Sequence, residues 1–187
     1  MKRLVIMTVG KTHSGKTTFA KALELALNNS LVIDQDNQAE FINACYDKLQ
    51  PKQGPNTLKY ELSRLIVDYA IENTELHLIV CNSNRNRKAR LNLLDELFNK
   101  KQFVRILVHF DISDDTLKER VVKSKRSTNI FRSASSFEEV LLRQITESQL
   151  EDVVDPDEGE ADHLFVIKDN VEVDSIIKQI VHISNCL

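Results

Sequence analysis

The sequence predicts a three-layer α/β fold, in which a five-stranded parallel sheet carries helices on both of its faces. The first observation is a set of short, almost continuous apolar runs, such as LHLIV at residues 76–80 and VRILVHF at residues 104–110. Such runs are typical of parallel strands that are buried on both faces. The second observation is that these runs alternate with longer segments in which apolar residues recur at helical spacing. This alternation indicates a parallel α/β sheet.

These patterns place the elements in order along the chain. Strands are expected at residues 4–9, 30–34, 77–81, 103–110 and 163–168. Helices are expected at about residues 16–28, 37–49, 57–73, 87–100, 114–125, 136–150 and 173–184. Ser113 is expected to cap the fifth helix, and Ser136 with Glu139 to form a capping box at the sixth. The stretch LQPKQGPN at residues 49–56 indicates a loop between the second and third helices.

The composition favours a single domain over residues 1–187. Hydrophobic residues make up 42% of the chain and no run of eighteen apolar residues occurs, so a membrane span is not expected. The first strand begins by residue 4, which leaves no room for a targeting peptide. The cysteines Cys45, Cys81 and Cys186 lack CxxC spacing and fit a reducing compartment. We therefore expect a cytoplasmic protein, whose oligomeric state the sequence does not indicate.

Charge is unevenly distributed along the chain. Residues 85–132 contain 13 Lys and Arg against 6 Asp and Glu, whereas residues 133–187 contain 3 against 13. The basic middle segment is compatible with phosphate-bearing partners, nucleic acid among them. A solvated helix face gives the same pattern, so the charge alone does not identify a partner.

The stretch VGKTHSGKTT at residues 9–18 holds two of the four glycines of the chain. From Gly10 to Thr17 it reads G-x-x-x-x-G-K-[ST], a spacing with which backbone N–H groups surround the phosphates of a nucleotide. An apolar strand pattern precedes it and a helical pattern follows, so the N-terminus of the helix faces the anion. An ordinary glycine turn is the alternative. The context favours a P-loop nucleotide-binding fold.

ATP and Mg²⁺ are the ligands expected at this loop. Lys16 is expected to contact the β- and γ-phosphates, and Thr17 to bind magnesium with Asp34. No N-K-x-D sequence occurs, so guanine is not the expected base. The residues expected to bind the nucleotide are Gly10, Lys11, Thr12, His13, Ser14, Gly15, Lys16, Thr17, Thr18 and Arg120.

The second predicted strand ends in VIDQDNQ, which places Asp34 and Asp36 beside the phosphate-binding loop. Phosphoryl transfer needs magnesium and often a carboxylate that orients or deprotonates the attacking hydroxyl. Two acids two positions apart can divide these tasks, with Asp36 as the base. The alternatives are that Asp34 is the base, or that Asp36 only caps the next helix while Asp34 ends the strand.

The third predicted strand leads into IVCNSNRNRKAR at residues 79–90. Asn82 stands where many nucleotide hydrolases have an aspartate that helps to hold magnesium. Its neutral amide cannot act as a base but can orient a water or a phosphate oxygen. The basic side chains that follow can contact an acceptor phosphate, and plain surface positions are the alternative. They are Arg85, Arg87, Lys88 and Arg90.

A polar, basic segment at residues 124–136 separates the fifth and sixth predicted helices. It is typical of a lid that closes over the transferring phosphates, with Arg120, Arg126 or Arg132 contacting them. A flexible surface loop is the alternative.

Taken together, these stretches resemble the P-loop kinases, and most of all the kinase domain of the polynucleotide kinase family and its small-molecule relatives. The similar stretches are GKTHSGKTT, IDQDNQ, VCNSNRNRKAR, FDISDDTLKERVVKSKR and DEGEADHLFVI. The resemblance implies that Asp36 is the general base, that Arg120 lies beside the nucleotide, and that Arg126 is a lid arginine. Asn84 and Arg90 match the third stretch. The family's acceptor-binding arginine falls on Ala39, which weakens the case for a polynucleotide 5′-hydroxyl.

The sequence therefore predicts an ATP-dependent kinase that transfers the γ-phosphoryl group to a hydroxyl acceptor. Its expected catalytic residues are Lys16, Asp36 and Arg126. The acceptor stays open between a nucleic-acid 5′ end, a nucleoside and another small molecule. The alternative function is an ATPase or a nucleotide-dependent binding switch without a phosphorylated acceptor, which the missing third-strand carboxylate suggests.

Overall fold

The structure is a computed structural model that describes residues 2–54 and 56–187. Met1 of the predicted domain and Pro55 of the predicted loop at 49–56 lie outside the described residues. Five parallel strands form one sheet in the order β2-β3-β1-β4-β5. The strands are β1 (Arg3–Val9), β2 (Ser30–Asp34), β3 (His77–Cys81), β4 (Phe103–Phe110) and β5 (His163–Ile167).

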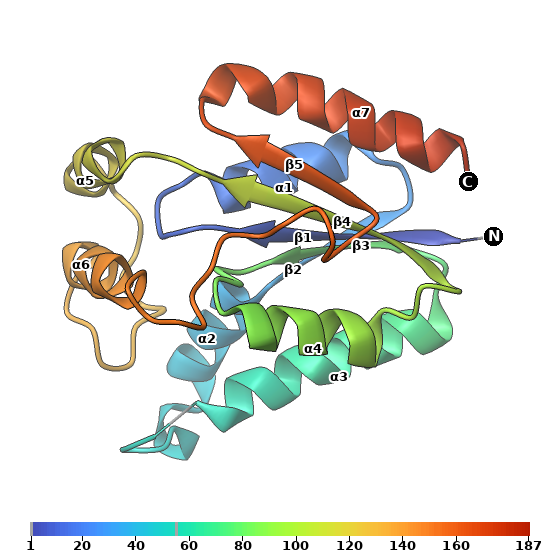
Figure 1. Cartoon of the computed structure of the whole chain (residues 1–187). Helices are drawn as coiled ribbons and strands as arrows, with labels where there is room; N and C mark the ends of the chain where they lie inside the picture. The colour runs from blue at the N-terminus through green and yellow to red at the C-terminus, as the bar shows by residue number, and fades with distance from the viewer. Residues whose placement is uncertain (1, 55) are drawn as a thin grey trace.

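Helices cover both faces of this sheet, as the apolar strands predict. The helices are α1 (Lys16–Ala26), α2 (Gln35–Cys45), α3 (Thr57–Asn73), α4 (Arg87–Leu97), α5 (Asp114–Val122), α6 (Phe137–Glu147) and α7 (Val173–Asn185), with short 3₁₀ turns η1 (Asp47–Leu49) and η2 (Asn170–Glu172). Helices α1 and α7 lie on one face, and α3 and α4 on the other (Figure 1). The predicted three-layer α/β fold is confirmed.

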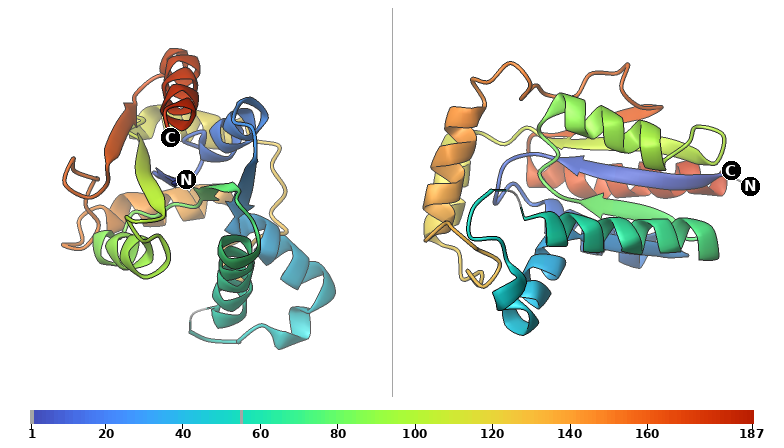
Figure 2. Two further views of the ribbon diagram at one scale, coloured as in Figure 1. Left: turned by 90° about the vertical axis from the view of Figure 1, so that its right-hand side faces the viewer. Right: turned by 90° about the horizontal axis from the view of Figure 1, so that it is seen from below.

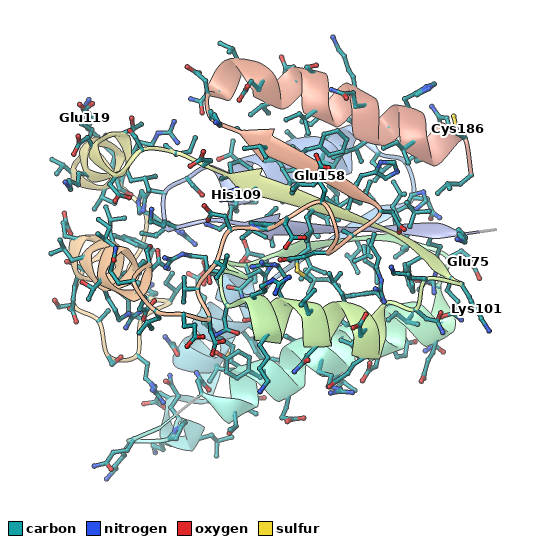
Figure 3. All side chains as sticks on the ribbon, viewed as in Figure 1. Glu75, Lys101, His109, Glu119, Glu158 and Cys186 are labelled. Atoms are coloured by element: carbon teal, nitrogen blue, oxygen red, sulfur yellow. The ribbon has the colours of Figure 1, made fainter. Side chains whose placement is uncertain are left out.

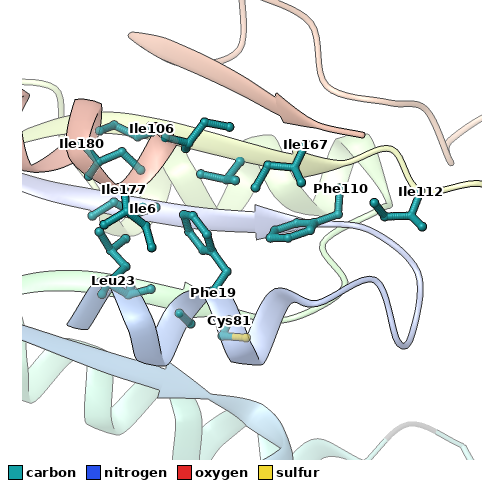
Figure 4. Close-up of a cluster of buried hydrophobic side chains, with 14 of the residues drawn as sticks. Ile6, Phe19, Leu23, Cys81, Ile106, Phe110, Ile112, Ile167, Ile177 and Ile180 are labelled. Atoms are coloured by element: carbon teal, nitrogen blue, oxygen red, sulfur yellow. The ribbon is translucent and has the colours of Figure 1, made fainter. Parts of the chain in front are cut away.

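Alternation along the central strand builds the two halves of the core. Leu4 and Ile6 of β1 face α1 and α7, whereas Val5 and Met7 face α3 and α4. The first half is drawn in Figure 4, where Phe19 and Phe110 pack edge to face with ring centroids 5.6 Å apart. Because both faces of β1 are buried, the loop that follows the strand is held on a rigid support.

The carboxyl ends of the strands meet at one edge of the sheet, where α2, α5 and α6 lie (Figures 1 and 2). In parallel α/β sheets, ligands bind at this edge. The helices on the two faces of the sheet, α1, α3, α4 and α7, do not cover this edge. In the described ranges, no helix combines the length and the apolar character needed to cross a membrane.

Several predicted helix ends are wrong by two to four residues. Helix α1 ends at Ala26 because Leu27 is extended and Asn29 adopts a left-handed φ of 57°. Helix α4 ends at Leu97, where Phe98 turns toward Phe103. The other differences are at α2, which starts at Gln35 and ends at Cys45, at α5, which ends at Val122, and at α6, which spans Phe137–Glu147.

The helix caps were predicted in part. Ser113 caps α5 by accepting from the N–H of Thr116. Ser136 caps α6 in the same way, through the N–H of Glu139. The predicted capping box is wrong, because the Glu139 carboxylate accepts from the N–H and hydroxyl of Ser135 instead of reaching Ser136.

A buried ion pair fixes the loop before β5 onto α4. Arg90 is 0% exposed and Glu160 1%, and the guanidinium donates to both carboxylate oxygens, with Nε–Oε2 at 2.6 Å and Nη2–Oε1 at 2.9 Å. The surface position considered for Arg90 is therefore wrong. Removing one partner of a buried pair leaves the other charge desolvated without compensation.

We expect Glu160→Gln to lower the free energy of unfolding by about 3–5 kcal/mol, since the Arg90 guanidinium would stay buried. Urea denaturation followed by circular dichroism measures the change. Glu158→Gln is the matched control, because Glu158 lies exposed on the same loop (Figure 3). A loss for Glu160→Gln no larger than that for the control would contradict the structural role of the pair.

Candidate active site

The loop between β1 and α1 has the backbone geometry that its glycines predict. Gly10 has φ 152°, and a Cβ at this position would lie 3.0 Å from the Cβ of Phe110 and 3.0 Å from Ser14 Oγ. Gly15 has φ 106°, and His13 adopts a left-handed φ of 59°. The chain thus turns tightly from the end of the central strand into α1, whose first residue is Lys16.

Lys16 folds back over this loop. Its Nζ donates to the Lys11 carbonyl at 2.6 Å and to Ser14 Oγ at 3.3 Å. Desolvation by burial lowers the pKa of Lys16 to about 8, while Cys81, Asp36 and Asp34 act in the opposite direction. A bound polyanion would favour the charged form and raise this pKa again.

Arg120 forms hydrogen bonds to the backbone of the same loop. Its Nη1 donates to the carbonyls of His13 and Ser14, both at 3.3 Å, and its Nη2 donates to Asn170 Oδ1 at 3.1 Å. The guanidinium therefore lies between the phosphate-binding loop and η2. The role of Arg120 beside a nucleotide stays a prediction.

The imidazole of His13 packs against α6. Its ring meets that of Phe137 edge to face at 4.7 Å, and Nδ1 lies 3.0 Å from the Thr12 hydroxyl. Burial lowers the pKa of His13, and the positive charges of Arg126 and Lys16 lower it further. Both effects favour the neutral form of the His13 imidazole.

Thr17 and Asp34 form the oxygen pair on which the metal prediction depends. The Thr17 hydroxyl donates to Asp34 Oδ2 at 3.2 Å, and Asp34 Oδ1 accepts from the N–H of Asp36 at 3.0 Å. Asp34 is only 5% exposed. A hydroxyl and a carboxylate are hard oxygen ligands that suit Mg²⁺, which usually takes one or two protein groups and completes its shell with phosphates and waters. The residues present fit this ion.

Cys81, and not Asn82, is the third-strand residue that faces this pair. Cys81 Sγ lies 3.7 Å from Thr17 Oγ1, and burial raises the pKa of the thiol to about 11. The expectation that Asn82 takes the place of the carboxylate stays a prediction. Its side chain also lines the cleft, where the amide donates to Gln35 Oε1 at 2.9 Å and accepts from the N–H of Ser83 at 2.8 Å. The register of β3 places Cys81 beside Asp34, because the two residues pair.

Asp36 is engaged by the segment predicted as a lid. Arg126 Nη2 lies 2.5 Å from Asp36 Oδ2, and the Arg126 guanidinium lies 5.2 Å above the ring of Phe137. Asp34 supplies the cap of α2, so the alternative that Asp36 only caps this helix is wrong. The Asp36 side chain is 39% exposed and that of Arg126 36%, so the pair contributes little to stability.

Residues 124–136 connect α5 to α6 without a helix or strand and reach across to α2 (Figure 2). Asn43 Nδ2 donates to the carbonyls of Asn129 and Phe131 at 2.5 and 3.1 Å. Arg132 donates to the carbonyls of Pro51 and Gly54 at 3.2 and 2.7 Å. We refer to residues 124–136 as the lid segment.

Most of these groups surround one cleft of about 1020 Å³. Eleven of the predicted site residues line it, namely Thr12, His13, Ser14, Gly15, Lys16, Thr17, Thr18, Asp34, Asp36, Arg120 and Arg126. Gly10 and Lys11 are not in its lining. The Gly10 N–H donates to the Ser83 carbonyl, and the Lys11 ammonium pairs with Asp114 at 2.8 Å.

Comparison with known protein families assigns most of the chain to one family. A family described as an AAA domain matches residues 5–148, which run from β1 to just beyond α6. The chain belongs to this family. No curated protein sequence matches the chain.

Several solved structures have a similar fold over almost the whole length of this chain. A kinase candidate from Chloroflexus aurantiacus has a TM-score of 0.64 at 17% identity, covering 99% of this chain and 97% of its own. Shikimate kinase from Bacteroides thetaiotaomicron has 0.59 at 17%, covering 97% and 98%. A gluconokinase from Sinorhizobium meliloti has 0.57 at 18%, covering 97% and 92%. The predicted P-loop kinase-like fold is confirmed, while the resemblance to polynucleotide kinases stays a prediction.

Most of the basic residues after β3 stabilise the fold and do not line the cleft. Arg90 pairs with Glu160, and Arg87 pairs with Glu160 and Asp157, both at 3.1 Å. Arg85 donates to the Gln144 carbonyl and the Ser148 hydroxyl. The hypothesis that they contact an acceptor phosphate gains no support. Asn84 is also structural, since its amide donates to the Thr8 carbonyl at 2.9 Å.

Sequence reasoning missed several cleft residues that lie on α3, α6 and the turn before α3. They are Asn56, Lys59, Tyr60, Arg143 and Gln144. Gln144 Oε1 accepts from the N–H of Thr12 at 2.6 Å. These residues belong to ordinary amphipathic helices without a motif, so only the tertiary fold reveals that they reach the cleft.

Proposed function

We propose that the chain is an ATP-dependent phosphotransferase that moves the γ-phosphoryl group of ATP to a hydroxyl acceptor. The observation that carries this proposal is the juxtaposition of the phosphate-binding loop with two acidic side chains that have different surroundings. Asp34 is buried against Thr17, whereas Asp36 is accessible in the cleft and contacts Arg126. The fold, which is similar to that of solved kinase structures, also supports a phosphotransferase.

The surroundings assign different tasks to the two acids. Both Asp34 oxygens already accept hydrogen bonds, from Thr17 and from the N–H of Asp36. Asp34 is thus suited to hold a metal, and Asp36 to act on an acceptor hydroxyl. Thr17 and Asp34 would hold Mg²⁺, which when bound neutralises charge on the β- and γ-phosphates.

In the proposed reaction, the acceptor oxygen attacks the γ-phosphorus and the bond from this phosphorus to the β–γ bridging oxygen breaks. ADP leaves, and the hydroxyl proton passes to Asp36. Lys16 and the N–H groups of the loop bind the phosphate oxygens, which concentrate negative charge as the bond breaks. The cleft walls position the two substrates in line.

An ATPase or a nucleotide-dependent switch is the second candidate function. The observation that favours it is the lack of a carboxylate at the end of β3, where many nucleotide hydrolases place one near the metal and where this chain has Cys81 and Asn82. Formation of ADP by the purified protein separates the two candidates. If the protein is a kinase, adding a pool of cellular metabolites or nucleic-acid ends increases the rate of ADP formation. If it is an ATPase, the addition leaves this rate unchanged.

We expect Arg126→Ala to lower turnover by about 10²-fold and to change ATP affinity much less, because a lid arginine acts mainly on charge that develops in the transition state. In the structure, Arg126 pairs with Asp36, so it must exchange this contact for phosphate oxygens. Amide hydrogen exchange of the lid segment is expected to slow when ATP, magnesium and acceptor bind. Lys125→Ala, at the exposed neighbouring position, is the control.

Normal turnover in Arg126→Ala, together with equal protection of residues 124–136 with and without the substrates, would contradict this role. The segment would then be a surface loop.

A further inference from the structure

We propose that the acceptor is a small hydroxyl compound that carries an anionic group, a phosphate or a carboxylate, and that Lys59 binds this group. This inference rests on the proposed phosphotransfer and adds to it the chemical class of the acceptor. It follows from the position of Lys59 in the cleft and from the absence, in the described residues, of a carboxylate paired with it.

The sheet order divides the cleft at the phosphate-binding loop, which follows the central strand β1. On the side of β4 and β5, the lining comes from α5, α6, η2 and the start of α7 and includes Arg120 and Asn170. On the side of β2 and β3, it comes from α2 and α3 and includes Asp36 and Lys59. We call this second part the acceptor half, because it contains the proposed base.

Lys59 is the cation best placed to bind a ligand in the acceptor half. It lies in the first turn of α3, partly buried, with its Nζ 5.2 Å from the centroid of the Tyr60 ring. Within residues 2–54 and 56–187, no carboxylate forms an ion pair with it. A partly desolvated ammonium without a counter-charge is stabilised by a charge-assisted hydrogen bond to an incoming anion.

Electrostatics agree with this position. Burial lowers the pKa of Lys59, the negative charges of Asp36 and Asp34 raise it, and Arg132 lowers it. Asp36 pairs with Arg126, and Asp34 accepts a hydrogen bond from Thr17, so neither carboxylate is paired with Lys59. A neutral polyol gains little from an ammonium in this position, whereas a phosphate or carboxylate gains a charge-assisted hydrogen bond.

The lid segment borders the outer end of the acceptor half, and this limit favours a small acceptor over a polymer end. Arg132 joins the lid segment to the carbonyls of Pro51 and Gly54. Arg132 and Phe131 line both the cleft and a second hollow of about 590 Å³ outside it, so these side chains lie between the two. Ala39, a small residue on α2, leaves space beside Asp36 and supplies no charge of its own.

The test measures transfer of label from radiolabelled ATP by the full-length protein with magnesium. Cell metabolites are separated on an anion exchanger into a retained, anionic fraction and an unretained fraction. We expect the retained fraction alone to yield a phosphorylated product. Part of it is treated with alkaline phosphatase, which is removed before the assay. Loss of activity then identifies a phosphomonoester acceptor, and retained activity identifies a carboxylate.

Variants of Lys59 link this specificity to the proposed site. Lys59→Gln is expected to raise the amount of the anionic fraction needed for half-maximal transfer by about 10-fold or more, since a hydrogen bond to a charged group is lost. The KM for ATP is expected to change less than about threefold. Lys59→Arg keeps the charge and is expected to retain most of the affinity. Lys21→Gln, on the exposed face of α1, is the matched control.

The outcomes separate the two proposals. A product formed from the unretained fraction alone would overturn the anionic acceptor while leaving phosphotransfer intact. An unchanged half-maximal amount in folded Lys59→Gln would overturn the role of Lys59. If neither fraction accepts label although the protein binds ATP, the proposed phosphotransfer fails, and the acceptor class fails with it.

Discussion

Lys16→Ala is expected to abolish measurable phosphoryl transfer while the protein stays folded. Within residues 2–54 and 56–187, its Nζ donates hydrogen bonds to the Lys11 carbonyl and Ser14 Oγ of its own loop, and the side chain belongs to neither half of the core. Losing a hydrogen bond from a charged donor is expected to weaken ATP binding by about 10- to 100-fold. Losing charge stabilisation in the transition state lowers turnover by a further factor of about 10²–10³.

Isothermal titration calorimetry and the rate of label transfer measure the two effects separately. Lys16→Met keeps most of the apolar stem and removes only the charge, so it separates lost packing from lost electrostatics. Lys21→Ala on the exposed face of the same helix is the control for the substitution itself. Wild-type affinity for ATP in Lys16→Ala would end the assignment of this loop as the phosphate site.

The lowered pKa of Lys16 adds a proton-linked signature to the same experiment. Because burial lowers the pKa of Lys16 to about 8, part of the free protein carries a neutral Lys16 near this pH. Bound phosphates favour the ammonium, so ATP binding at pH 8 should take up protons at this site. Calorimetry in buffers of different ionisation enthalpy measures this uptake. In Lys16→Met the contribution should disappear.

The fold and the phosphate-binding loop could be predicted because their signals are local. The G-x-x-x-x-G-K-[ST] spacing needs only the residues from Gly10 to Thr17, and the structure places His13, Gly10 and Gly15 at the unusual φ values that such a loop requires. Apolar runs likewise identify buried parallel strands without knowledge of their partners. Helix ends were less predictable, because Leu27 and Phe98 continue the apolar period after the backbone has turned.

The rest of the candidate site depends on contacts between segments far apart in the sequence. Arg90 looks like part of a basic surface run, and only Glu160, seventy positions away, makes it a buried structural residue. Lys59 shows no motif, and its place in the cleft follows from the packing of α3 beside α2. Cys81 faces Thr17 through the register between β2 and β3, which the sequence of β3 alone does not specify.

Asp36→Asn is expected to lower turnover by about 10²- to 10⁴-fold, the usual contribution of a positioned base, with ATP affinity nearly unchanged. The amide has almost the same shape but cannot accept the acceptor's proton. It also loses the ion pair with Arg126, which is exposed enough for stability to change little. Thermal unfolding verifies the fold, and Asp47→Asn on the adjacent turn η1 is the control.

Asp34→Asn distinguishes between the two acids, because the proposed roles predict different dependences on magnesium. Asp34 contacts Thr17, so its substitution is expected to raise the Mg²⁺ concentration needed for half-maximal turnover, and added Mg²⁺ should restore part of the rate. Asp36→Asn is expected to leave that concentration unchanged, and no amount of Mg²⁺ should restore its rate. If Asp34→Asn is instead the variant that Mg²⁺ cannot restore while Asp36→Asn turns over almost normally, the base is Asp34. Arg126 would then contact Asp36 only to hold the lid segment against α2.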